Sequence, residues 1–131
     1  MNYVLDTHTL YWYLCDPGKL PTQVDEIIMS MDNGDDNIAI IPTIVLAEIQ
    51  YIFEKRKAPL NLLEEIIHEI EKKPFFKIVP FSRDHLLLLP KLRAIREMHD
   101  RIIVAIAKAC EAKIISKDRN IKKWKSTEVV W

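Results

Sequence analysis

The chain has few of the residues that mark flexible loops, disulfide frameworks or membrane segments. Only two of its 131 residues are glycine and two are cysteine, whereas 49% are hydrophobic. This composition indicates a packed core rather than a disordered chain, and the length suits one domain spanning residues 1–131. No apolar run approaches the roughly 20 residues needed to cross a bilayer, so we expect no membrane association.

Cysteine and charge exclude further classes of protein. Cys15 and Cys110 form no C-x-x-C motif and are too few for a disulfide framework, so we expect two small core residues. The start of the chain lacks the basic region of a signal peptide, which makes the cytoplasm the default location. The 19 basic and 19 acidic residues balance, so there is no general attraction to nucleic acid, although a local basic patch remains open.

Short apolar runs of strand length alternate with segments of helical periodicity. Strands are predicted at 2–5, 38–41, 76–79, 113–115 and, at an edge, 128–130. Helices are predicted at 7–14, 21–31, 43–57, 60–72, 82–96 with an interruption at Pro90, and 100–111, with a loop or short helix at 118–124. This order predicts an α/β three-layer sandwich, in which helices flank a mostly parallel central sheet.

Four acidic residues adjoin apolar segments, where packing does not explain a carboxylate. Asp6 and Asp118 follow predicted strands, Asp100 opens a predicted helix, and Glu48 lies on the apolar stripe of its own helix. The carboxyl ends of parallel strands meet at one edge of a sheet, so we expect these side chains to converge there. Converging carboxylates repel one another unless a cation lies between them, which predicts a site for a hard divalent metal with oxygen ligands.

Each of these residues also has a purely structural interpretation. Asp6 could end its strand in a turn, Asp100 could cap a helix, and Asp118 could form an Asx-turn. Glu48 could point into solvent between large side chains. The order and placement of all four together favour the metal site.

Several segments together resemble PIN-domain ribonucleases, close to the VapC toxins of bacterial and archaeal toxin–antitoxin pairs. The resemblance extends along the whole chain and is carried by Tyr3-Val4-Leu5-Asp6-Thr7-His8-Thr9-Leu10-Tyr11-Trp12, Leu46-Ala47-Glu48-Ile49, the run from His99 to Ala107, Ile114-Ile115-Ser116-Lys117-Asp118 and Val129-Val130-Trp131. Two departures are a serine at position 116, where threonine is commoner, and the absence of the frequent His-x-Asp-Pro-Phe lead-in before Asp100.

The resemblance implies a metal-dependent endoribonuclease. Asp6, Glu48, Asp100 and Asp118 would form the acidic quartet that binds Mg²⁺ or Mn²⁺, and RNA would be the substrate. We expect Asp6 and Asp100 to bind the metal directly, and Glu48 and Asp118 to bind it directly or through water. Thr7 and Ser116 would orient these ligands by hydrogen bonds. The resemblance also implies a cognate antitoxin and a homodimer.

Substrate contacts are predicted from charge near the acidic residues. Arg101, Lys117 and Arg119 would neutralise RNA phosphates, in a basic cluster that continues through Lys122, Lys123 and Lys125. Trp124 is expected to pack beneath this surface rather than stack on a base. His8 and His99 flank the acids, but Mg²⁺ prefers oxygen ligands, so neither is assigned a role.

Three other classes of protein compete with this interpretation. A haloacid-dehalogenase-type phosphatase needs a second aspartate two residues after Asp6, where this chain has His8. A receiver domain needs paired acids near the first strand and a later lysine, and Asp6 stands alone there. A non-catalytic PIN-fold module for RNA or protein binding would have lost acidic residues, yet all four are present.

Overall fold

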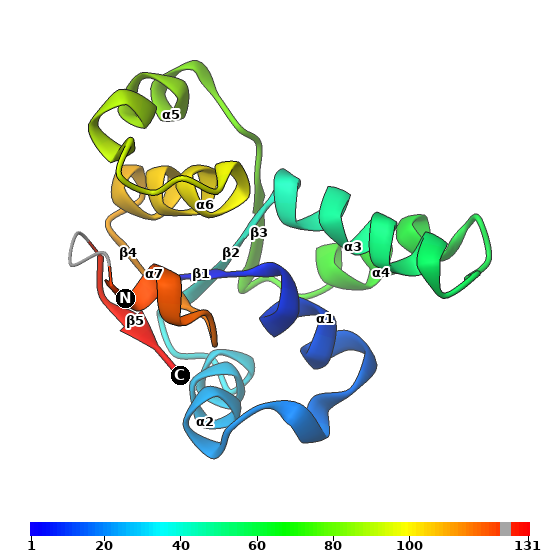
Figure 1. The fold of residues 1–131 in the computed structure, drawn as a ribbon. Coiled ribbons are helices and arrows are strands. Elements are labelled where there is room, and N and C mark those ends of the chain that lie inside the picture. Colours follow the sequence, from blue (N-terminus) through cyan, green and yellow to red (C-terminus); the bar gives the residue numbers. More distant parts are fainter. Residues whose placement is uncertain (124–126) are drawn as a thin grey trace.

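The computed structural model describes residues 1–123 and 127–131 and has a parallel sheet at its centre (Figure 1). Its five strands lie in the order β3-β2-β1-β4-β5, and every neighbouring pair is parallel. Their bounds are β1 (Asn2–Leu5), β2 (Ile38–Pro42), β3 (Phe76–Val79), β4 (Ala112–Ile115) and β5 (Val129–Val130). The predicted α/β class and parallel sheet are therefore confirmed.

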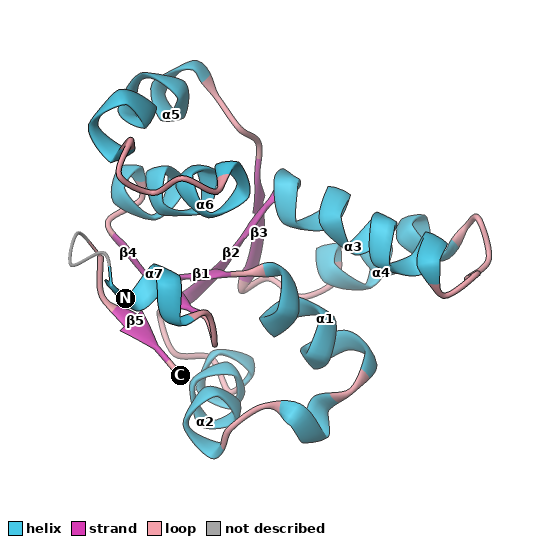
Figure 2. Cartoon of the chain, in the orientation of Figure 1, coloured by secondary structure: helices cyan, strands magenta, loops and turns pink. Residues whose placement is uncertain are grey.

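Helices connect the strands and lie on both sides of the sheet (Figures 1 and 2). In Figure 1, α5 and α6 lie above the sheet, α1 and α2 lie below it, and α3 and α4 project to the right as an antiparallel pair. The helices are α1 (Thr7–Cys15), α2 (Thr22–Asp32), α3 (Thr43–Lys55), α4 (Leu62–Glu71), α5 (Arg83–Leu88), α6 (Met98–Ala109) and α7 (Arg119–Lys123), with 3₁₀ turns η1 (Pro17–Lys19) and η2 (Leu89–Leu92).

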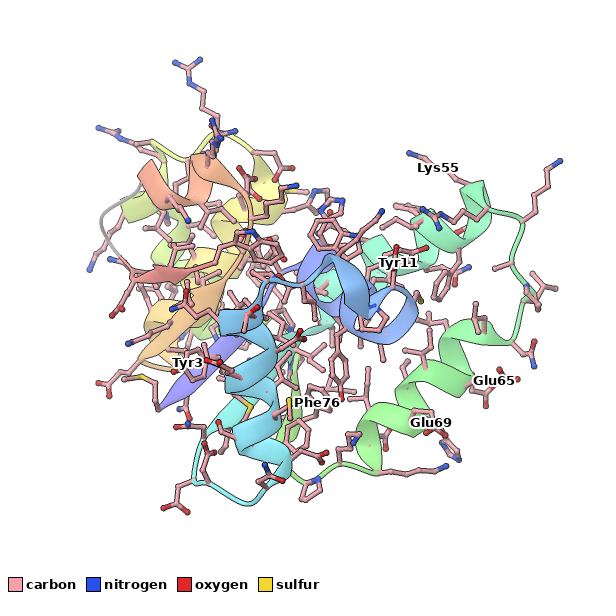
Figure 3. All side chains as sticks on the ribbon, turned by 90° about the horizontal axis from the view of Figure 1, so that it is seen from below. Tyr3, Tyr11, Lys55, Glu65, Glu69 and Phe76 are labelled. Atoms are coloured by element: carbon pink, nitrogen blue, oxygen red, sulfur yellow. The ribbon has the colours of Figure 1, made fainter. Side chains whose placement is uncertain are left out.

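The core is built from the central strands and the helix faces turned toward them. Val4, Leu5, Ile41 and Ile114 have no exposed surface, as expected for strands covered on both faces. The two faces of α4 differ in burial, as the helical periodicity of residues 60–72 predicts. Its Ile66 and Ile70 are buried, whereas Glu65 and Glu69 lie on the outer side (Figure 3). Among the described residues, every helix is too short or too polar to span a bilayer.

Two sequence predictions near α5 and α6 were wrong in their boundaries. The helix expected to reach Arg96 ends its α-helical part at Leu88, because Pro90 cannot donate the next backbone hydrogen bond and a 3₁₀ turn takes over. Helix α6 begins at Met98, two residues before Asp100. The chain between η2 and α6, residues 93–97, is therefore not helical.

The predicted burial of the cysteines was also wrong. Cys15 is exposed and Cys110 is half-buried. Cys15 is the last residue of α1, and Cys110 follows the end of α6 as its C-cap. Both therefore lie at helix ends rather than on a buried helix stripe, and Cys110 packs against the edge of the core.

Strand register places the ends of β1 and β4 side by side. Leu5 pairs with Ile115, so Asp6 and Ser116 are the next residues on two neighbouring strands. The Asp6 backbone N–H still donates to the Ile115 carbonyl at 3.3 Å. The Thr9 hydroxyl donates to the same carbonyl at 2.9 Å and ties the first turn of α1 to β4. This edge of the sheet is therefore a fixed platform for the acidic residues.

Candidate metal centre

Asp6 is buried at the C-terminal end of β1 and is held through both carboxylate oxygens. Its Oδ1 accepts a hydrogen bond from the Thr9 backbone N–H at 2.9 Å, which makes Asp6 the N-cap of α1. Its Oδ2 accepts from the Ser116 hydroxyl. Each carboxylate oxygen can accept more than one bond, so Asp6 keeps acceptor capacity toward a cation. The turn interpretation and the metal interpretation are thus compatible.

Ser116 links Asp6 to Asp118. Its hydroxyl oxygen accepts a hydrogen bond from the Asp118 backbone N–H at 2.9 Å while its proton goes to Asp6. The Asp118 Oδ1 accepts from the Asn120 backbone N–H at 2.8 Å, as in an Asx-turn at the start of α7. Ser116 has no exposed surface. A single buried hydroxyl therefore sets the positions of two of the predicted acidic residues.

Glu48 points toward the same edge from the second turn of α3. Its Oε1 accepts a hydrogen bond from the Thr7 hydroxyl at 2.8 Å, and its side chain is 27% exposed. Its Oε2 lies 3.8 Å from His99 Nδ1. The bond from Thr7, which follows Asp6 directly, joins α3 to the start of α1. Glu48 therefore does not point freely into solvent.

Asp100 lies in the first turn of α6 but is not its cap. The N-cap is Glu97, whose Oε2 accepts from the Asp100 backbone N–H at 2.8 Å. Glu97 Oε1 lies 2.9 Å from His99 Nδ1. The capping role considered for Asp100 is thus filled by another residue, and its own carboxylate is left for the cleft.

The pKa of Asp100 shows that the acidic side chains act on one another. It is raised from an ordinary aspartate value to about 6, first because burial disfavours the charged form. The negative charges of Asp118, Glu97, Glu48 and Asp6 raise this pKa further, in that order. Burial and neighbouring negative charge therefore both disfavour the ionised form of Asp100, and a bound cation would offset that cost.

One cleft of about 440 Å³ brings the four predicted acids together. Its lining residues are Asp6, Thr7, His8, Trp12, Glu48, Asp100, Ile103, Lys117 and Asp118. They come from α1, α3, α6 and the segment after β4, which meet at the C-terminal edge of the sheet. Residues separated by more than 100 positions in sequence therefore form one site.

Comparison with known proteins identifies the family. A family model described as the PIN domain matches residues 3–125. The chain belongs to the PIN-domain family. No curated protein matches this sequence.

Solved structures share the fold of this PIN domain at low sequence identity. A chain of VapBC2 from Rickettsia felis, bound to a promoter DNA fragment, superposes with a TM-score of 0.75 at 20% identity, covering 99% of this chain and 98% of that one. VapBC from Salmonella typhimurium bound to DNA superposes with a TM-score of 0.69 at 14% identity, covering 99% of this chain and 97% of that one. A toxin–antitoxin complex from Klebsiella pneumoniae superposes with a TM-score of 0.64 at 17% identity, covering 98% of this chain and 96% of that one.

The donor set of this PIN domain fits a hard divalent cation. The cleft is lined by four carboxylates, the Thr7 hydroxyl and the His8 imidazole, and this mainly oxygen-donor set is the chemistry that Mg²⁺ and Mn²⁺ prefer. Within residues 1–123 and 127–131, no three His, Cys, Asp or Glu side chains form a ready-made metal cage. Mg²⁺ keeps several of its waters and takes only one or two direct carboxylates. The arrangement therefore suits a hydrated ion with some carboxylates bound through water.

Of the three predicted substrate residues, one lines the cleft, one is exposed at the start of α7 and one is bonded to the backbone. Lys117 lines the cleft, with its Nζ 5.6 Å from the centroid of the Trp12 ring. Arg119 is exposed at the start of α7. Arg101 is turned to the backbone, since its Nε donates to the Ile95 carbonyl at 2.7 Å and its Nη2 to the Arg93 carbonyl at 3.2 Å. Lys122 is exposed, whereas Trp124 and Lys125 lie outside the described residues.

Sequence reasoning missed Trp12, which lines the cleft of this PIN domain, and Glu97, which caps the helix that carries Asp100. The Trp12 ring centroid lies 5.5 Å from that of His8 and 5.6 Å from that of Trp131. The i, i+4 spacing of His8 and Trp12 places both on one helix face and could have indicated this. Glu97 was missed because a glutamate is not among the preferred N-cap residues.

Proposed function

We propose that this PIN domain is a Mg²⁺- or Mn²⁺-dependent endoribonuclease and the toxin of a toxin–antitoxin pair. The observation that carries the proposal is the single cleft that Asp6, Glu48, Asp100 and Asp118 line together; the raised pKa of Asp100, caused first by burial and then by neighbouring acids, agrees with it. Such a concentration of negative charge destabilises an empty cleft and favours a divalent cation. The similarity of fold to chains of toxin–antitoxin complexes supports the biological role.

In this proposal the four acids of the cleft and the hydroxyls that hold them have defined tasks. Asp6 and Asp100 bind the cation directly, while Glu48 and Asp118 bind it directly or through water. The chemistry that the ion would supply is polarisation of a phosphoryl oxygen and a lowered pKa of the water that attacks the phosphodiester. Thr7 and Ser116 hold Glu48 and Asp6 in place through the hydrogen bonds described above.

In the proposal, Lys117 neutralises the RNA phosphate that enters the cleft. Its ammonium group lies at the cleft wall beside the Trp12 ring. A positive charge here offsets the repulsion between the phosphate and the four acids. Arg119, exposed at the start of α7, would add to attraction of the RNA over a longer range.

The decisive experiment compares Asp6→Asn with Asp36→Asn on a labelled single-stranded RNA. Asparagine keeps the shape of the side chain and removes its charge. Asp36 is exposed in the loop between α2 and β2 and controls for loss of any one negative charge. We expect wild type and Asp36→Asn to cleave with Mn²⁺ and to be inactive in EDTA, and Asp6→Asn to be inactive in both. Full activity of Asp6→Asn, or cleavage unchanged in EDTA, would refute the mechanism.

A non-catalytic PIN-fold binding module is the second candidate. The observation in its favour is that no three metal-binding side chains of the described residues form a ready-made cage. Isothermal titration with Mn²⁺ separates the two functions. Binding that is lost in Asp6→Asn supports the nuclease, whereas no binding at millimolar metal supports the module.

The toxin role and the assembly state can be tested together in cells and in solution. Induced expression should arrest growth for the wild type and not for Asp6→Asn, and co-expression of the antitoxin should relieve the arrest. We also propose a homodimer, supported by the exposed Phe81, Leu86 and Leu87 on and beside α5. Light scattering of the purified chain measures this directly, and a monomer at micromolar concentration would contradict it.

A further inference from the structure

A second groove adjoins the acidic cleft, and Asp100 lines both. Its volume is about 810 Å³, and it is lined by Arg93, Ala94, Ile95, Arg96, Glu97, Asp100 and Asn120. All but the last two come from the segment between η2 and α6, which Figure 2 shows as a loop crossing α6. A chain that leaves the acidic cleft past Asp100 therefore enters a groove with two arginines along it.

The groove presents two arginine side chains to a ligand, beside the carboxylates of Glu97 and Asp100. Arg93 and Arg96 are both exposed along it. Both carboxylate oxygens of Glu97 already have partners, since one accepts the Asp100 backbone N–H and the other lies 2.9 Å from His99 Nδ1. Two guanidinium groups and the Asn120 amide remain for recognition. Guanidinium groups match phosphate in geometry and charge and bind it through paired hydrogen bonds.

Arg101 holds the segment that carries these arginines. Its Nε and Nη2 donate to the carbonyls of Ile95 and Arg93, at 2.7 and 3.2 Å. The segment is also anchored by Leu92 and Ile95, which are 6% and 3% exposed. The Ile95 N–H donates to the Leu92 carbonyl at 2.9 Å and closes the turn. The backbone of residues 93–97 is thus fixed on α6 rather than loose in solvent.

We propose that this groove binds the phosphates of single-stranded RNA beside the bond that is cut, through Arg93 and Arg96, and that Arg101 is a positioning residue. The inference rests on the proposed nuclease function and extends it by naming where the substrate continues. It replaces the expectation from sequence that Arg101 contacts a phosphate. Two of the Arg101 donors are already used by backbone carbonyls, whereas the side chains of Arg93 and Arg96 line the groove.

The test measures RNA binding separately from cleavage. Arg93→Ala/Arg96→Ala is made in the Asp6→Asn background, and anisotropy of a fluorescent single-stranded RNA is measured in Mg²⁺ across a salt series. The matched control is Arg83→Ala/Lys91→Ala, which removes two exposed positive charges from α5 and η2. We expect the slope of log K against log salt to fall by about 1.4 for the groove variant, because each phosphate contact contributes about 0.7. The control should change it little.

Parallel cleavage assays on proteins that retain Asp6 distinguish failure of the groove proposal from failure of the nuclease proposal. If these proteins cleave RNA but both double variants bind with the same salt slope, the groove proposal is overturned and the nuclease stands. If no divalent metal supports cleavage while Arg93→Ala/Arg96→Ala still lowers the slope, the nuclease proposal fails and the groove remains an RNA-binding surface.

Arg101→Lys tests the positioning role. Lysine keeps the charge but cannot reproduce both hydrogen bonds of the planar guanidinium group. Limited trypsin digestion with detection by mass spectrometry should show faster cutting after Arg93 and Arg96, with cutting after Arg83 unchanged. In cleavage assays KM should rise severalfold while kcat is largely kept. Unchanged digestion and KM in Arg101→Lys would overturn the positioning role.

Discussion

The Ser116 hydroxyl donates a hydrogen bond to Oδ2 of Asp6 although the two residues are 110 positions apart in sequence. The pairing of β1 with β4 makes this possible, because it sets Leu5 opposite Ile115 and the next residue of each strand side by side. The same hydroxyl accepts the Asp118 backbone N–H. One buried side chain therefore couples two of the four acidic residues to the sheet.

Ser116→Ala should weaken metal binding by about tenfold, the lower end of the effect seen when a group that orients a metal ligand is removed. The alanine leaves Oδ2 of Asp6 and the Asp118 N–H without their partner, so that Asp6 is held only by the Thr9 N–H. Isothermal titration with Mn²⁺ measures the change. Ser116→Thr is the matched control, because it keeps the hydroxyl. Equal affinities of Ser116→Ala and wild type would show that the hydroxyl does not position the ligand.

Asp118→Asn should separate the charge of this residue from its structural role. Asparagine keeps the oxygen that accepts the Asn120 N–H, so the start of α7 is preserved. Loss of the charge should reduce metal affinity by about tenfold and lower the pKa of Asp100, because Asp118 contributes the largest of its charge effects. NMR titration of the Asp100 carboxyl measures the second effect.

Asp118→Ala provides the comparison. It removes both the charge and the capping oxygen, and should cost roughly 1 kcal/mol more in unfolding free energy than Asp118→Asn. If the two variants match in stability, the hydrogen bond to Asn120 contributes nothing. If Asp118→Asn binds Mn²⁺ as wild type does, Asp118 is no part of the metal site.

Asp100→Asn should stabilise the metal-free protein, and only at higher pH. The folded-state pKa of about 6 lies above the unfolded value of 3.8, so the folded protein binds more protons in between and loses stability as pH rises through 6. Solvent screening of this half-buried carboxyl reduces the cost to roughly 1 kcal/mol. In EDTA the variant should melt about 3 °C above wild type at pH 8, and the gap should narrow toward pH 5.

Saturating Mg²⁺ should reverse the order of the two melting temperatures, because a ligand that binds the folded state stabilises it and the variant binds the ion less well. Thermal melts of wild type and Asp100→Asn at pH 5 and 8, each with EDTA and with Mg²⁺, measure both effects. A gap in EDTA that is the same at both pH values would mean that the Asp100 charge is not the cause.

Much of the fold can be predicted from local sequence pattern. The predicted strand at 76–79 is observed with the same bounds, and the amphipathic spacing of residues 60–72 matches the buried and exposed faces of α4. Periodicity predicts these elements because burial of one face is a property of neighbouring residues. The conformation after Pro90 was predicted wrongly, since a proline marks a break in a helix but does not determine the path of the residues beyond it.

The candidate site was predictable in its members but not in their hydrogen bonds. Asp6 and Asp118 follow parallel strands, and general sheet geometry alone places such residues at one edge. The roles of the four acids in catalysis stay a prediction. The cap on α6 and the orientation of Arg101 could not be predicted from the sequence. Both depend on backbone groups in a segment whose path the sequence does not specify.

By itself, then, the order of residues determined the alternation of strands and helices and the presence of carboxylates at strand ends, because these are consequences of short-range spacing. Only the tertiary structure decided that Trp12 faces the acids, that Ser116 bridges two of them, and that Arg93 and Arg96 rather than Arg101 line the groove. The reason is physical. Each of these features depends on which distant groups compete for the same donor or the same space, and that competition exists only once the chain is folded.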